Sequence, residues 1–134
     1  MQISAYNTGT RTANRRLVRI EIFDPPMCCP TGLCGPTTDP ALLDIYEAVL
    51  KIKTEYDGRA VVERYVLGQQ PAKFMQQPEV IRRLKAHGVA ILPVTVVDGV
   101  VLKEKVYPSY EELKQWIEDA SRTLYERSWI INVY

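Results

Sequence analysis

The hydrophobic pattern of this chain opens with a strand over residues 17–23. Apolar side chains occupy every second position and charged side chains stand between them: Val18, Ile20 and Ile22, with Arg19 and Glu21. A period of two is typical of a strand with one buried face. Residues 60–67, which are rich in valine, predict a second strand. Two more strands, at 94–97 and 100–102, are predicted because they flank Asp98-Gly99, a pair that favours a two-residue hairpin turn.

Three other segments show the period of a helix. The first begins at Asp39-Pro40, an N-cap followed by proline at the first helical position, and stops at Gly58. Its apolar residues recur at helical spacing: Leu42, Ile45, Tyr46, Val49, Ile52 and Tyr56. The second helix runs from Gln77-Pro78-Glu79 to His87-Gly88. The third opens with Ser109-Tyr110-Glu111-Glu112, which is a capping box.

These elements follow the order βαβαββα. A strand–helix–strand unit has parallel strands and a right-handed crossover, and a hairpin with a final helix completes a thioredoxin-like fold. We therefore predict an α/β domain over residues 17–126, with a central four-stranded mixed sheet flanked by helices. Residues 1–16 are mostly polar and predict a mobile arm. For the apolar tail over 127–134 the sequence leaves two roles open, covering part of the core and forming a partner surface.

Length and composition favour one globular domain. The 134 residues are 46% hydrophobic and 25% charged, which suits a single core. The net charge of +1 gives no bulk attraction to nucleic acid or to a membrane surface. No apolar run approaches the length of a membrane span, and the N-terminus lacks the apolar core of a signal peptide. The expected partners therefore do not include a membrane.

All three cysteines lie in one loop after the first predicted strand. Cys28 and Cys29 are neighbours, and Cys34 follows five positions later. The prolines and glycines around them disfavour a helix or a strand. A single cysteine is most simply explained as a small core residue, but a loop of this composition is rarely buried. The loop can bring Cys34 back to the adjacent pair, so that three sulfur atoms converge.

Three thiolates suit a soft ion. An odd number of cysteines argues against a disulfide framework, and unpaired thiols indicate a reducing compartment, the cytoplasm. Zinc takes four ligands and would need His87, the only histidine, which the pattern instead places at a solvent-facing helix end. Trivalent arsenic and antimony form three pyramidal bonds and prefer sulfur, so Cys28, Cys29 and Cys34 would satisfy either ion. The amides and dipole of the helix that starts at Pro40 would favour thiolate if the loop folds toward them.

The string Phe-Asp-Pro-Pro-Met-Cys-Cys-Pro-Thr-Gly-Leu-Cys-Gly, starting at Phe23, resembles the signature of the ArsD family. Members of this family are arsenical metallochaperones and trans-acting repressors of arsenic-resistance operons. The resemblance covers roughly residues 17–118, and four later strings continue it in the right order: Gln69-Gln70-Pro71, Leu92-Pro93-Val94, Asp98-Gly99 and Tyr107-Pro108. Some members carry further vicinal cysteine pairs near the C-terminus, and this chain has none after Cys34.

The resemblance implies that Cys28, Cys29 and Cys34 bind arsenic(III) or antimony(III) as cargo, with no cofactor required. It also implies transfer of this cargo to the ATPase subunit of an arsenite efflux pump (ArsA type). In thioredoxin-like folds a proline placed like Pro93 is usually cis and adjoins the site loop. Transfer itself would run by stepwise thiol exchange, for which an exposed loop is suited.

Two other functions are weighed against the metallochaperone. A metalloid-responsive repressor, which the resemblance also implies, would contact operator DNA. The sequence shows no helix-turn-helix pattern, and besides the arginines of the arm its basic candidates are Arg82, Arg83 and Lys85. A thiol–disulfide oxidoreductase or an arsenate reductase is disfavoured, because the Cys-x-x-Cys spacing is absent and the loop carries no basic residue. We therefore predict a protein that is not an enzyme; whether it forms a homodimer is left open.

Overall fold

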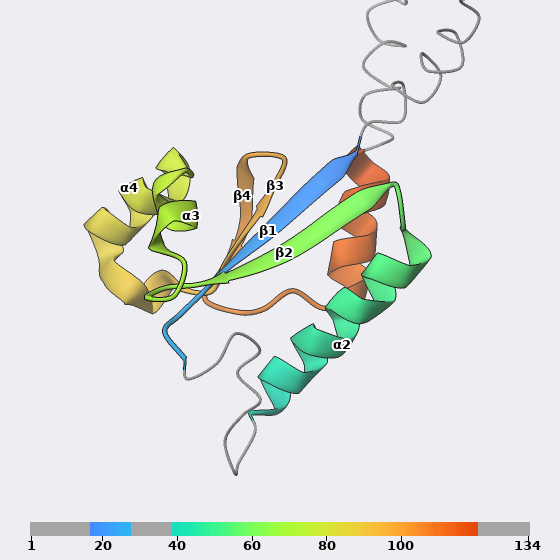
Figure 1. Cartoon of the computed structure of the whole chain (residues 1–134), viewed down its shortest axis with the longest axis horizontal. Helices are drawn as coiled ribbons and strands as arrows, with labels where there is room; N and C mark the ends of the chain where they lie inside the picture. The colour runs from blue at the N-terminus through green and yellow to red at the C-terminus, as the bar shows by residue number, and fades with distance from the viewer. Residues whose placement is uncertain (1–16, 28–38, 121–134) are drawn as a thin grey trace, which may run out of the picture.

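The structure, a computed structural model, describes residues 17–27 and 39–120 of the chain (Figure 1). Four strands form one sheet in the order β2-β1-β3-β4. The strands are β1 Val18–Asp24, β2 Ala60–Val66, β3 Val94–Val97 and β4 Val100–Glu104. β1 is parallel to β2 and antiparallel to β3, which pairs antiparallel with β4. The predicted mixed sheet of four strands is confirmed.

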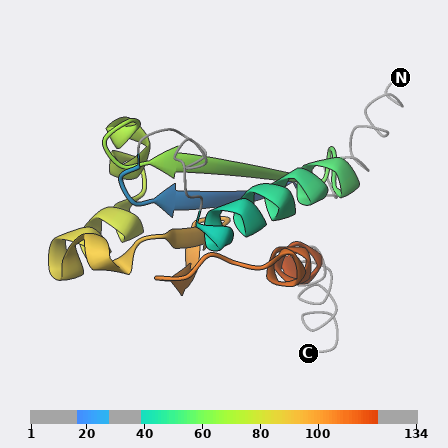
Figure 2. The same cartoon turned by 90° about the horizontal axis from the view of Figure 1, so that it is seen from below.

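Helices cover both faces of this sheet (Figure 2). Their bounds are α2 Pro40–Glu55, α3 Pro71–Met75, α4 Pro78–His87, the 3₁₀ helix η1 Gly88–Ile91, and a helix over residues 110–120. One core cluster joins α2, the helix over 110–120 and one face of β1 and β2. A second cluster joins α3, α4 and η1 to the other face. This arrangement is the thioredoxin-like fold that the element order predicts.

The local signals for helix starts and for the hairpin turn are confirmed. Asp39 caps α2 by accepting a hydrogen bond from the Ala41 amide at 2.9 Å. Ser109 and Glu112 exchange side-chain and backbone hydrogen bonds at 2.9 and 3.1 Å, as a capping box requires. In the β3–β4 turn, the φ angles of Asp98 and Gly99 are +50° and +86°, so both residues are left-handed.

Two details differ from the sequence prediction, and a third part of it is not tested. Tyr46 is 37% exposed and Ala48 is buried in its place, because the buried face of α2 is centred on Ile45, Val49 and Ile52. The short helices α3 and η1 were not predicted, since neither is long enough to show a helical period. The predicted arm over 1–16, the tail over 127–134 and the end of the predicted domain at residue 126 lie outside the described residues.

The peptide bond between Leu92 and Pro93 is cis, as the family resemblance implies. Pro93 directly precedes β3, whose first residue, Val94, pairs with Phe23 of β1. The proline therefore adjoins the end of β1, where Asp24 is the last residue of the strand. The cis peptide bond therefore lies beside the end of β1, from which the chain continues to the cysteines.

The outer strand β4 is irregular. The pairing of β3 with β4 shifts between Thr95 and Val96, which leaves Leu102 without a partner residue in β3. Lys105, directly after the strand, has a φ of +73°. Val100 and Leu102 of this strand are 59% and 43% exposed.

Candidate functional site

The candidate site lies where β1 ends and the chain crosses to α2. Ligand sites in open α/β sheets lie at the carboxyl ends of strands, and this connection carries Cys28, Cys29 and Cys34. All three cysteines lie outside the described residues, so the predicted convergence of their sulfur atoms stays a prediction. The structure describes the two ends of the connection, residues 24–27 and 39–41.

A buried ion pair occupies the first of these ends. Asp24 is fully buried, and its carboxylate accepts hydrogen bonds from Nε and Nη2 of Arg64 at 3.0 and 2.9 Å. The hydroxyl of Tyr107 donates to the same carboxylate. Burial is the larger cause, and this hydrogen bond the second, of a raised pKa of Tyr107. The Arg64 guanidinium lies 5.4 Å from the centre of the Tyr107 ring. The negative charge at the end of β1 is therefore compensated from two other segments of the chain.

The residues after Asp24 are held from the end of β2. The Leu67 amide donates to the carbonyl oxygen of Asp24 at 3.1 Å. The side-chain amide of Gln69 donates from Nε2 to the carbonyl oxygen of Met27 at 3.0 Å. Met27 directly precedes Cys28 in the sequence. The path of the chain into the cysteine-bearing connection is thus fixed on both sides of Pro25-Pro26.

The other end of the connection corrects one expectation. The amides and the dipole of α2 are expected to favour a thiolate if the loop folds toward them, but Asp39 already accepts hydrogen bonds from the Ala41, Leu42 and Leu43 amides. Its side chain bonds the Ala41 amide at 2.9 Å, and its carbonyl oxygen accepts from Leu42 and Leu43 at 2.9 and 3.3 Å. Pro40 has no amide hydrogen. A thiolate near this helix would thus gain only from the helix dipole, which the Asp39 carboxylate partly offsets.

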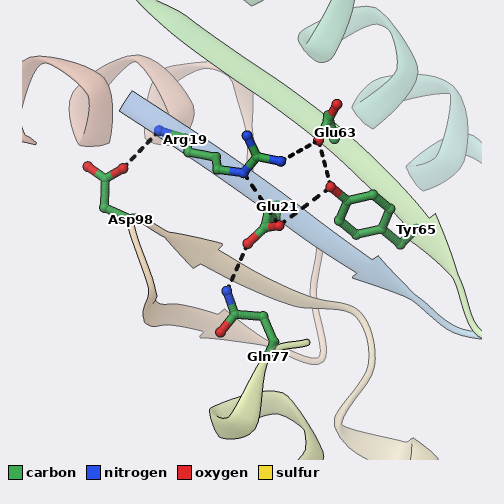
Figure 3. Close-up of polar contacts among 6 residues, drawn as sticks. All are labelled: Arg19, Glu21, Glu63, Tyr65, Gln77 and Asp98. Carbon is green, nitrogen blue, oxygen red and sulfur yellow. Dashed lines mark hydrogen bonds and ion pairs between the residues drawn. The ribbon is translucent and has the colours of Figure 1, made fainter. Parts of the chain in front are cut away.

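A second polar cluster lies on the sheet face opposite α2 (Figure 3). Arg19 pairs with Glu63 at 3.0 Å and with Glu21 at 3.6 Å, and the Tyr65 hydroxyl donates to Glu63 at 2.6 Å. Two more contacts link this cluster to α4 and to the hairpin turn: Gln77 Nε2 to Glu21 at 2.9 Å, and the Arg19 amide to Asp98 at 2.9 Å. The cluster joins four elements of the fold, and we assign it a structural role.

We expect alkaline pH to destabilise the fold through two buried tyrosines. Burial, with a hydrogen bond to Glu63, raises the pKa of Tyr65 to about 12. Burial, with a hydrogen bond to Glu118, raises the pKa of Tyr56 to about 12. The unfolded chain ionises its tyrosines near pH 10. Below that pH, the contribution of Tyr65 and Tyr56 to the free energy of unfolding is therefore complete. It is lost as the pH rises from about 10 through about 12.

Chemical denaturation at a series of pH values, with tyrosinate absorbance as a second signal, checks this expectation. Tyr65→Phe should make the decline above pH 10 shallower. A decline of equal slope in Tyr65→Phe and in the unmodified chain would contradict the assignment.

The other sequence candidates were a zinc ligand and a basic surface. His87 is exposed at the last residue of α4, as expected. Within residues 17–27 and 39–120, no three His, Cys, Asp or Glu side chains are grouped so as to hold a metal ion. Arg82 and Arg83 both pair with Glu79, at 2.6 and 3.1 Å, and Arg83 also pairs with Glu104. Carboxylates therefore compensate two of the three basic residues proposed for DNA contact.

Sequence reasoning missed the Asp24–Arg64–Tyr107 group. A signal was present, because Asp24 and Arg64 are charged residues at positions where their strands are otherwise apolar. Their partnership depends on contacts across 40 residues, and that with Tyr107 across 83, so the pairing itself is a result of the fold. None of the helices in residues 17–27 and 39–120 is long and apolar enough to cross a membrane.

The fold and the site define a thioredoxin-like domain whose cysteines follow its first strand and whose cis-proline adjoins that strand. The chain belongs to the ArsD family: residues 17–128 match the family model described as arsenical resistance operon protein ArsD. The family membership expected from the cysteine string is thus confirmed.

Curated relatives and a solved structure agree with this family. An arsenical resistance operon trans-acting repressor ArsD of Escherichia coli is 38% identical over 95 residues, which are 71% of this chain and 77% of the relative. A second protein of that name and organism is 36% identical over 98 residues, 72% and 78% of the two chains. The crystal structure of an arsenical resistance operon trans-acting repressor from Bacteroides vulgatus has a TM-score of 0.67 and 36% identity, covering 75% of this chain and 92% of that one.

Proposed function

We propose that this protein is a metallochaperone that binds arsenic(III) or antimony(III) through Cys28, Cys29 and Cys34. One observation carries the proposal: all three cysteines of the chain lie within one stretch of seven residues, 28–34, in the connection that follows β1. This is the edge of an α/β sheet at which ligands bind. Membership of an arsenic-resistance family supports the choice of a pyramidal metalloid over zinc.

The chemistry is exchange of ligands without a change of oxidation state. When arsenous acid binds, each As–O bond is replaced by an As–S bond, and each thiol proton leaves with a hydroxide as water. In transfer, an incoming thiol of the partner forms a new As–S bond, and its proton passes to the departing cysteine sulfur. Because the thiolate is the metal ligand, the ease of thiol deprotonation sets the rate. The proposed recipient is the ATPase subunit of an arsenite efflux pump, and the proposed compartment is the reducing cytoplasm.

The second candidate is a metalloid-responsive repressor that contacts operator DNA. It is favoured by the names of the relatives, which describe them as trans-acting repressors of arsenical resistance operons. The paired state of Arg82 and Arg83 gives it less support from α4. A mobility shift on operator DNA that arsenite abolishes would establish this role, and both roles are compatible with one three-sulfur site.

X-ray absorption of the arsenite-loaded protein tests the primary proposal. We expect three sulfur atoms around arsenic and no nitrogen or oxygen, because three thiolates complete the pyramid of the ion. The protein reacted beforehand with a thiol-alkylating reagent serves as the control and should retain no arsenic. A first shell that contains oxygen or nitrogen in the untreated protein would contradict the three-sulfur site.

A further inference from the structure

The chain is held at a buried point four positions before Cys28. The Asp24 carboxylate has no exposure to solvent and accepts from both the Arg64 guanidinium and the Tyr107 hydroxyl. A buried ion pair is a weak source of net stability, because loss of hydration offsets the attraction. The bidentate geometry of the Arg64–Asp24 pair does, however, fix the position of the carboxylate closely. An ion pair at this place is therefore better explained by the orientation it imposes than by the stability it adds.

A second contact holds the chain at the residue directly before Cys28. Gln69 donates to the carbonyl oxygen of Met27 at 3.0 Å from the turn after β2. Between the two held points stand Pro25 and Pro26, whose rings restrict φ to about −65°. Residues 24–27 therefore form a stiff segment that is attached at both ends to β2 or to the turn that follows it.

We propose that Arg64, Tyr107 and Gln69 are positioning residues for metalloid capture, acting through Asp24 and Met27 on the start of the cysteine-bearing connection. This inference rests on the metalloid-binding function proposed above. A three-sulfur site requires its donors to converge, and chain entropy opposes that convergence. Fixing the start of the connection removes part of this entropic cost before the ion binds. Mutating a residue that hydrogen-bonds a metal ligand directly typically costs roughly 10–100-fold in metal affinity, so residues that act through Asp24 and Met27 are expected at the lower end of that range.

Tyr107→Phe tests the buried point, because it removes the hydroxyl and leaves the ring. Tyr56→Phe is the matched control. It removes a hydroxyl that donates to the Glu118 carboxylate at 2.7 Å, and Tyr56 caps the far end of α2, about 24 Å along the helix from Pro40. We expect Tyr107→Phe to weaken arsenite binding roughly tenfold, and Tyr56→Phe to leave it unchanged.

Gln69→Ala tests the surface contact at a residue that is exposed and outside both core clusters. Its matched control is Gln77→Ala, because Gln77 also donates from Nε2 to one oxygen acceptor, that of Glu21 at 2.9 Å, within the other polar cluster. Gln69→Ala should weaken arsenite binding, and X-ray absorption at limiting arsenite should show fewer sulfur neighbours per arsenic than in the unmodified protein. Gln77→Ala should reproduce the unmodified spectrum.

The arsenite dissociation constant, the absorption spectrum and the thermal midpoint are measured for all four variants. The thermal midpoint shows whether Tyr107→Phe still folds, and Gln69→Ala tests the proposal should it not. Unchanged affinity and sulfur count in Gln69→Ala, or equal losses in a variant and its control, would overturn the proposal. Failure of the unmodified protein to bind arsenite through three sulfurs would instead overturn the proposed function.

Discussion

Replacing any one of Cys28, Cys29 or Cys34 with serine is expected to cause the largest loss of metalloid binding of any single change. Each substitution exchanges one thiolate for a hydroxyl, a harder ligand that suits arsenic(III) poorly, and leaves two sulfurs for an ion that forms three bonds. The loss of affinity should exceed the roughly 10–100-fold effect of removing an outer partner of a metal ligand. Isothermal titration with arsenite, run under reducing conditions, measures it for each variant.

His87→Gln is the control for these substitutions. His87 is exposed at the end of α4, so its replacement should leave arsenite affinity unchanged. A loss comparable with that of the cysteine variants would indicate a fourth ligand and a site of the zinc type. Undiminished affinity in all three serine variants would remove the basis of the three-sulfur proposal.

Arg64→Met is expected to destabilise the fold by about 3–5 kcal/mol, because it leaves the buried Asp24 carboxylate without its compensating charge. The Arg64 side chain is 10% exposed and that of Asp24 is not exposed at all. Adding Asp24→Asn to the same chain should recover most of the lost stability, since the neutral side-chain amide can still accept a hydrogen bond from the Tyr107 hydroxyl. Urea denaturation followed by circular dichroism gives the free energy of unfolding for each variant.

Arg19→Met provides a matched control at the surface. Arg19 also pairs with a carboxylate, that of Glu63 at 3.0 Å, but the two side chains are 49% and 44% exposed. Exposed pairs of this kind contribute about 0–1 kcal/mol. An equal destabilisation by Arg19→Met and Arg64→Met would show that burial of Asp24 does not determine the cost.

The parts of the fold that the sequence predicts well are those with short-range causes. The cap at Asp39, the capping box at Ser109 and the turn at Asp98-Gly99 each depend on residues no more than three positions apart. The alternation in β1 is also local. By contrast, α3 buries only Phe74, and it does so in a core cluster that includes Phe23, whose ring centre lies 5.0 Å away. No local pattern could reveal it.

The candidate site also has one part that the sequence predicts and one part that it does not. Cysteine count and spacing predict the ligand chemistry, because three thiols in one loop are a property of composition. The residues that hold the start of that loop could not be identified in advance, since Arg64, Gln69 and Tyr107 come from β2, the turn after it and the segment after β4. Their convergence on Asp24 and Met27 exists only in the folded chain.

The irregular strand β4 has a consequence for solubility. An open sheet edge with apolar side chains can template pairing with other chains and start fibril growth. Here Leu102 has no partner in β3, and the left-handed Lys105 ends the extended backbone directly after the strand. An incoming extended peptide could therefore match only a few consecutive donors and acceptors, so Val100 and Leu102 can face water without seeding aggregation.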